Sequence, residues 1–95
     1  MKRYGSVYKI TNLVTGKSYI GQTTQPPERR FAQHKSDSRS GRHLFLSIQK
    51  YGVSNFLFEE LVVCFDRESL DKSETYFIEK YNTFSPNGYN LTMGG

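Results

Sequence analysis

The sequence predicts an α+β fold over a single domain, residues 1–95, in which a three-stranded antiparallel sheet is flanked by helices in β-β-α-α-β-α order. Two short stretches rich in β-branched and aromatic residues come first, separated by turn-forming residues. Two stretches with apolar residues at helical spacing follow, and a further extended stretch precedes the last helical one. A chain of this length has room for one core, so no second domain is expected.

The first two predicted strands, residues 4–11 and 17–22, should form a β-hairpin. They are separated by Asn, Thr and Gly residues, which favour a tight turn. A turn centred on residues 13–14 would place Tyr8 opposite Tyr19, on the same face of the sheet. A slip of one residue would separate the two rings, so the register decides whether they can share a site.

Two helices should follow the hairpin. The first is predicted for residues 26–35, because Thr24 offers a cap and proline is favoured in a first turn. The Ser-, Arg- and Gly-containing stretch at residues 36–42 should end it. The second helix is predicted for residues 43–51, where four apolar residues fall at helical spacing, and Gly52 is placed to end it.

The last two elements are a strand and a helix. Residues 55–64 read as a third strand, although two successive glutamates leave open which of its faces is buried. A final helix should begin at Asp66 or Ser69 and continue to about Tyr81. A turn is predicted at residues 85–88, which read Ser-Pro-Asn-Gly.

Charge is unevenly distributed along the chain. Residues 1–50 carry ten Lys or Arg and two acids, a net charge of +8, whereas residues 51–95 carry three against seven, a net charge of −4. The basic half favours a polyanionic partner, although a solvated surface with a chance excess of charge would look the same.

Cysteine usage and hydropathy restrict the class of protein. A lone Cys64 cannot form an internal disulfide or the thiolate set of a zinc site, which indicates a reduced, intracellular setting. No apolar stretch is long enough for a membrane helix, and the start of the chain does not resemble a signal peptide. We therefore expect a cytoplasmic domain, monomeric by itself, with no membrane partner.

The last predicted helix carries an acid within its apolar face. Leu70, Phe77, Ile78 and Tyr81 form the stripe, and Glu74 falls inside it. None of the residues three or four positions from Glu74 is basic, so a local helical ion pair is not available. An inward carboxylate needs a positive partner, either an arginine from elsewhere or a bound divalent cation, and the cation is the interpretation we favour.

The first predicted helix carries a pair suited to phosphate chemistry. Arg30 and His34 are four positions apart and so project from one helical face. Arginine donates two parallel hydrogen bonds to a phosphate, and histidine can move a proton near neutral pH. Two solvated surface residues would have the same spacing. His43, near the start of the second helix, is either another phosphate donor or an ordinary helix-terminal residue.

The paired motifs resemble one known family. Gly5-Ser6-Val7-Tyr8, eleven residues before Tyr19-Ile20-Gly21, resembles the double signature of the GIY-YIG nucleases, with Ser-Val-Tyr in place of the first Gly-Ile-Tyr. The resemblance continues along the chain through Arg30-Phe31 with His34, Lys50-Tyr51-Gly52 with Phe56 and Phe58, Glu74 with Ile78, and Gly88-Tyr89-Asn90.

The resemblance implies a metal-dependent DNA endonuclease with its site on one face of the sheet. It implies a catalytic set of Tyr8, Tyr19, Arg30, His34 and Glu74. Glu74 would bind one Mg²⁺ or Mn²⁺, Arg30 would hold the phosphate, and a tyrosine would orient or deprotonate the attacking water, giving 5′-phosphate and 3′-hydroxyl ends.

DNA contacts are expected outside that set as well. His43 and Asn90 resemble further active-site positions of homing-endonuclease members, and the basic residues Lys35 and Arg42 are additional candidates. Related nucleases join a domain of this size to a separate DNA-binding region. Two alternatives remain open: a DNA-binding module that does not cut, and a protein-interaction domain whose aromatic residues bind a partner.

Overall fold

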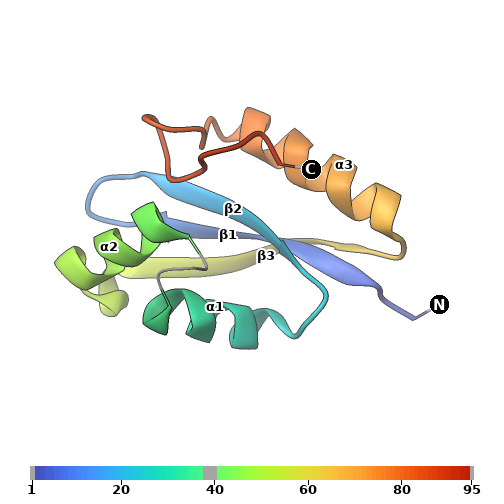
Figure 1. The fold of residues 1–95 in the computed structure, drawn as a ribbon, viewed down its shortest axis with the longest axis horizontal. Helices are drawn as coiled ribbons and strands as arrows, with labels where there is room; N and C mark the ends of the chain where they lie inside the picture. Colours follow the sequence, from blue (N-terminus) through green and yellow to red (C-terminus); the bar gives the residue numbers. More distant parts are fainter. Residues whose placement is uncertain (1, 38–40, 95) are drawn as a thin grey trace.

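The computed structural model describes residues 2–37 and 41–94 and contains a three-stranded antiparallel sheet of strand order β2-β1-β3. The elements are β1 (Gly5–Asn12), β2 (Ser18–Thr23), α1 (Pro27–Ser36), α2 (Arg42–Tyr51), η2 (Val53–Asn55), β3 (Phe56–Cys64) and α3 (Arg67–Lys80). Helix α3 covers one face of the sheet, and α1 and α2 lie along the other (Figure 1). The predicted fold class and element order are confirmed. The predicted break at 36–42 includes residues 38–40, which lie outside the described residues.

The hairpin brings the two tyrosines to one face by a different register from the predicted one. Tyr8 pairs with Gly21, and Tyr19 pairs with Ile10. Tyr8 and Ile10 are two residues apart on one strand and therefore point to the same side, so Tyr8 and Tyr19 are diagonal neighbours. The shared face is confirmed, and the predicted direct pairing of Tyr8 with Tyr19 is wrong.

The turn of the hairpin explains the difference in register. The Asn12 side chain accepts a hydrogen bond from the Val14 amide at 2.9 Å, and the Gly16 amide donates to the Asn12 carbonyl at 2.8 Å. Gly16 has a φ of 81°, which favours glycine. The turn is thus centred one residue later than residues 13–14, and both strands begin and end one residue later than predicted at 4–11 and 17–22.

Local capping differs between the helices. No side chain caps α1, whose N-cap residue is Pro26, so the predicted Thr24 cap is wrong. Gly52, with a φ of 88°, ends α2 as predicted. Asp66 caps α3 by accepting a hydrogen bond from the Ser69 amide at 2.7 Å, which decides between the two predicted starts.

Strand β3 contains an irregularity that explains its ambiguous pattern. The register against β1 shifts between Val7, which pairs with Val62, and Tyr8, which pairs with Glu60. Leu61 is the extra residue of this β-bulge, and both Leu61 and Val62 pack toward α3. The alternation of buried and exposed residues therefore breaks within β3, which a simple two-residue period cannot reproduce.

The sheet has a core on each face. On the side of α1 and α2, the buried cluster consists of Tyr8, Ile10, Leu44, Ile48, Phe56 and Tyr89. On the side of α3, it consists of Val7, Ile20, Cys64, Leu70 and Ile78. Tyr81, which was predicted to extend the apolar stripe, follows the last residue of α3 and is exposed. None of the helices among residues 2–37 and 41–94 is long and apolar enough to cross a bilayer.

Candidate active site

Three aromatic side chains meet between the sheet and α1. Tyr8, on the central strand β1, has no exposed surface, and its hydroxyl lies 2.6 Å from His34 Nε2 on α1. The Tyr19 ring lies edge-on to the His34 ring, with 5.1 Å between their centroids, and 6.3 Å from the Tyr8 ring. Hairpin and helix therefore bring three of the five predicted catalytic residues into direct contact.

Gly21 is the residue that lets the Tyr8 side chain lie across β2. A Cβ atom at Gly21 would overlap the Tyr8 hydroxyl and would come within 2.9 Å of the Tyr19 ring. Strand β2 is at the edge of the sheet, so the Tyr8 hydroxyl reaches past the central strand toward that edge. The glycine of the Tyr-Ile-Gly motif is thus explained by close packing.

Arg30 is the cation whose charge shifts the pKa values of all three rings. Its positive charge lowers the pKa of the Tyr8 phenol, and its Nη1 donates to Gln33 Oε1 at 2.9 Å. Burial raises the pKa of Tyr8 well above its ordinary value of 10.0, the neighbouring Tyr19 raises it further, and the Arg30 charge offsets only part of the rise. Burial likewise raises the pKa of Tyr19. Both phenols are therefore protonated at neutral pH.

His34 is neutral for the same physical reason. Burial, and then the positive charge of Arg30, lower the pKa of His34 from 6.5 to about 4. A neutral imidazole accepts at one nitrogen, and the protonated Tyr8 hydroxyl therefore donates to His34 Nε2. The proton of the ring then resides on Nδ1, which has no hydrogen-bond partner among residues 2–37 and 41–94.

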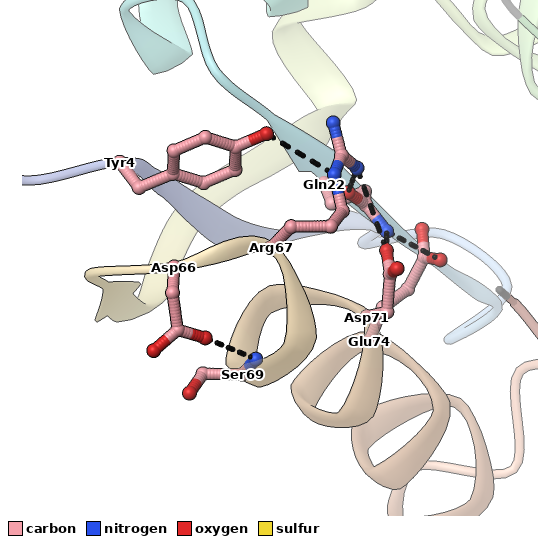
Figure 2. A network of polar contacts seen from close by, with 7 residues as sticks. All are labelled: Tyr4, Gln22, Asp66, Arg67, Ser69, Asp71 and Glu74. Atoms are coloured by element: carbon pink, nitrogen blue, oxygen red, sulfur yellow. Dashed lines mark hydrogen bonds and ion pairs between the residues drawn. The ribbon is translucent and has the colours of Figure 1, made fainter.

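Glu74 approaches the site from the other face of the sheet. It lies on α3, is half-buried, and accepts a hydrogen bond at 3.1 Å from Nε2 of Gln22 on β2 (Figure 2). Its negative charge raises the pKa of both Tyr8 and Tyr19, so the carboxylate acts on both phenols across β2. The predicted inward direction of Glu74 is confirmed. The expectation that all five residues share one sheet face is wrong, because α3 covers the opposite face.

A polar cleft lies beside the end of β2. Its volume is about 280 Å³, and it is lined by Gln22, Thr23, Thr24, Gln25, Arg30 and Arg67. Arg30 enters from α1 and Arg67 from the first turn of α3, so the two faces of the sheet contribute one arginine each. Two guanidinium groups at one polar cleft suit the phosphates of a nucleic acid backbone.

The donor set near the cleft fits a hard divalent cation that is shared with a substrate. Within the described part of the chain, no group of three or more His, Cys, Asp or Glu residues could enclose a metal. Glu74 and Asp71 both accept hydrogen bonds from Gln22 Nε2, at 3.1 and 2.8 Å, so their carboxylates face one small volume. Mg²⁺ is commonly held by one or two carboxylates together with substrate phosphates and water.

The predicted DNA-contacting residues are divided by burial. Lys35, Arg42 and His43 are exposed, with Lys35 over the Phe31 ring and Arg42 beside Tyr19 in a hollow of about 160 Å³. Asn90 is buried instead.

Both polar atoms of the Asn90 side chain form hydrogen bonds with the backbone of β2. Its Oδ1 accepts from the Ile20 amide and its Nδ2 donates to the Ile20 carbonyl, both at 2.8 Å, while Thr83 Oγ1 also donates to Oδ1 at 2.7 Å. This geometry holds the C-terminal segment to the strand that carries Tyr19. It disfavours the predicted direct contact of Asn90 with DNA.

Sequence reasoning missed three residues around Glu74. Gln22, Arg67 and Asp71 join in one network, in which Arg67 Nη1 donates to Gln22 Oε1 at 2.9 Å (Figure 2). Arg67 is seven positions before Glu74 and therefore on the same side of α3, two turns away. A search for cations over two helical turns, not one, would have included it. The role of Gln22 depends on tertiary packing and left no such signal.

Comparison with known proteins shows which family this chain resembles over most of its length. The family model described as the GIY-YIG catalytic domain matches residues 4–90. The proteins segD and segB of Enterobacteria phage T4, both named as endonucleases, are 32% and 34% identical over 89 residues, or 94% and 93% of this chain. The chain spans 38% of the length of each of these relatives.

Two solved structures of the catalytic domain of the intron endonuclease I-TevI have the same fold. One has a TM-score of 0.81 at 24% identity and covers 96% of both chains. The other has a TM-score of 0.78 at 25% identity and covers 93% of this chain and 98% of that one. The agreement includes the three-stranded sheet and the helices on both of its faces.

Proposed function

Because this chain belongs to the GIY-YIG family of endonuclease catalytic domains, we propose that it hydrolyses DNA phosphodiester bonds with one divalent metal ion, Mg²⁺ or Mn²⁺. The observation that carries the proposal is that Arg30 and Gln22 both line the cleft at the end of β2, while Gln22 donates a hydrogen bond to Glu74. These groups supply a fixed positive charge for a phosphate and a carboxylate for a cation. The charges of Arg30 and Glu74 both shift the pKa values of the Tyr8 and Tyr19 phenols.

Arg30 would hold the scissile phosphate. Its guanidinium lines the cleft, and its positive charge already acts on the neighbouring Tyr8 phenol. In the pentacovalent transition state the phosphate oxygens gain charge, so a positioned guanidinium binds that state more strongly than the ground state.

Glu74 would hold the metal ion, with Gln22 fixing the orientation of the carboxylate through the 3.1 Å hydrogen bond. When bound, Mg²⁺ or Mn²⁺ would neutralise charge on the phosphate and help the 3′-oxygen to leave, giving 5′-phosphate and 3′-hydroxyl ends. Asp71 lies on the same side of α3, but we assign the metal to Glu74, because the charge of Glu74 acts on both Tyr8 and Tyr19.

Tyr8 would orient the attacking water, assisted by Tyr19, which is partly exposed. Tyr8 has no exposed surface in the present arrangement, so its hydroxyl must become accessible before a water can bind to it. His34 would act through Tyr8 and not on the substrate, since it is fully enclosed and its Nε2 accepts a hydrogen bond from the Tyr8 hydroxyl. The Tyr8–His34 hydrogen bond thus fixes the orientation of the phenol that would position the water. The proton that the water loses would pass to the solvent in the cleft.

The rest of the basic half would bind the DNA backbone. Lys35, Arg42 and His43 are exposed on or beside α1 and α2, on the side of the sheet from which Arg30 enters the cleft. We propose that one copy of the domain binds one cleavage site, and that a separate region of a longer protein selects the target.

Metal removal tests this proposal. Supercoiled plasmid should be converted to nicked circles with Mg²⁺ or Mn²⁺, and the rate should fall to background when EDTA is added, because Glu74 cannot organise the reaction alone. DNA ligase should reseal the nicks, since it requires 5′-phosphate and 3′-hydroxyl ends.

The same assay separates the alternatives. Nicking that continues in EDTA would contradict the one-metal scheme. DNA binding by gel shift without nicking, in any metal, would show a DNA-binding module in place of a nuclease. Nicks that ligase cannot seal would contradict the proposed end chemistry.

A further inference from the structure

We propose that Arg67 is a second phosphate-binding residue, which contacts the DNA backbone at a phosphate next to the one held by Arg30. The inference rests on the proposed function, because it assumes that the cleft at the end of β2 receives DNA. It assigns a role to a residue that is not in the set of Tyr8, Tyr19, Arg30, His34 and Glu74.

The position of Arg67 is the first argument. Arg67 and Arg30 line the same polar cleft of about 280 Å³, and they enter it from helices on opposite faces of the sheet. The same cleft is lined by the last two residues of β2, Gln22 and Thr23, and by Thr24 and Gln25, which follow the strand. A backbone that places one phosphate on Arg30 and runs along this cleft would therefore pass Arg67.

The orientation of Arg67 is the second argument. Arg67 Nε donates to the Tyr4 hydroxyl at 3.1 Å, Nη1 donates to Gln22 Oε1 at 2.9 Å, and the guanidinium carbon lies 5.4 Å from the centre of the Tyr4 ring (Figure 2). These contacts fix the plane of the guanidinium before any ligand binds. Less side-chain entropy is then lost when a phosphate is bound.

Hydrogen-bonding capacity is the third argument. Arg67 has five N–H donors, and within residues 2–37 and 41–94 no hydrogen bond uses its Nη2 atom. The side chain is 57% exposed. Its ion pair with Asp71 is long, at 3.4 Å, and lies at the surface, where such pairs contribute little. A phosphate can therefore bind Nη2 without displacing a strong internal contact.

The network also connects this second phosphate to the metal-binding carboxylate. Gln22 accepts from Arg67 through Oε1 and donates to Glu74 through Nε2. A phosphate on Arg67 would hold the guanidinium in the position that keeps Gln22 oriented. Binding of the flanking DNA would then favour the Glu74 geometry required for cleavage.

DNA binding without metal tests the inference independently of cleavage. The affinity of wild type and of Arg67→Gln for a short duplex is measured by fluorescence anisotropy in EDTA over a series of salt concentrations. The plot of log K against log salt should be less steep for Arg67→Gln by about one unit, the value expected for one lost phosphate contact. Circular dichroism and thermal melting confirm that each variant is folded.

Two control variants separate a phosphate contact from a change in charge or structure. Lys72→Gln removes one positive charge from an exposed position of the same helix and should leave the slope unchanged. Asp71→Asn removes the ion-pair partner of Arg67 and should not reduce the slope.

An unchanged slope for Arg67→Gln would overturn the inference, as would an equal reduction in either control. Plasmid nicking by wild type is scored separately. A wild type that binds with the expected slopes but never nicks would refute the proposed function and leave the Arg67 contact standing.

Discussion

Replacing Arg30 with alanine should lower the single-turnover nicking rate by about two to three orders of magnitude, equivalent to roughly 3–4 kcal/mol of lost transition-state stabilisation. DNA affinity should change much less, because Arg30 would be one of several cations along the bound backbone. The reason is differential binding: the guanidinium lines the cleft, where it would face charge that develops on the phosphate only as the bond breaks.

Arg29→Ala is the matched control for this experiment. Arg29 is adjacent to Arg30 in α1 and exposed, so its removal changes the net charge equally without altering the site. We expect near wild-type nicking by Arg29→Ala and incomplete rescue by Arg30→Lys, since lysine lacks the planar pair of donors. Equal losses for the two alanine variants would mean that Arg30 contributes only to general attraction of DNA.

Acidification should destabilise the fold through His34. Its pKa is about 4 in the folded protein and 6.5 when unconstrained, so the unfolded chain binds a proton that the folded chain does not between these values. The contribution of His34 to the free energy of unfolding is therefore fully present above about pH 6.5, and it is lost as the pH decreases toward 4. From pH 7 to about pH 4.5 the loss from His34 alone should be about 2 kcal/mol.

Urea denaturation at the two pH values measures this loss. Carboxylates also contribute to acid sensitivity. The part due to His34 is therefore the pH-dependent loss of unfolding free energy in wild type minus the same loss in His34→Gln. His43→Gln, at an exposed position, is the control and should retain the full pH dependence of wild type. If His34→Gln were as acid-sensitive as wild type, His34 could not be the buried neutral acceptor of the Tyr8 hydroxyl.

The element order could be predicted because it depends on periodicity and on strong local signals. The apolar residues of α2 and α3 recur at helical spacing, and Gly52 as the end of α2 and Asp66 as the start of α3 are signals that lie within one helical turn. The hairpin register could not be predicted, because it depends on hydrogen bonds from the Asn12 side chain and on the backbone of Gly16. The same turn-forming residues are compatible with either of the two turn centres, so they do not select one register.

The part of the candidate site that could be predicted consists of residues that lie close together on one helix. Arg30 and His34 lie on one face of α1, and both act on Tyr8. The arrangement around Glu74 was not predictable, because Gln22 is 52 residues away in the chain and meets it only through the packing of α3 on the sheet. The β-bulge at Leu61 likewise exists only once β1 and β3 are paired.

The central claim is that Arg30 and Glu74 reach one phosphate and one cation from opposite faces of the sheet, across the edge strand β2. The most direct test is a crystal structure of the domain with a DNA duplex and Mn²⁺, in which anomalous scattering locates the ion. The account predicts a Mn²⁺ peak at coordination distance, roughly 2 Å, from a Glu74 oxygen, with a phosphate oxygen bound to both the ion and Arg30. A Mn²⁺ ion on other residues, or a phosphate beyond hydrogen-bond distance of Arg30, would contradict it.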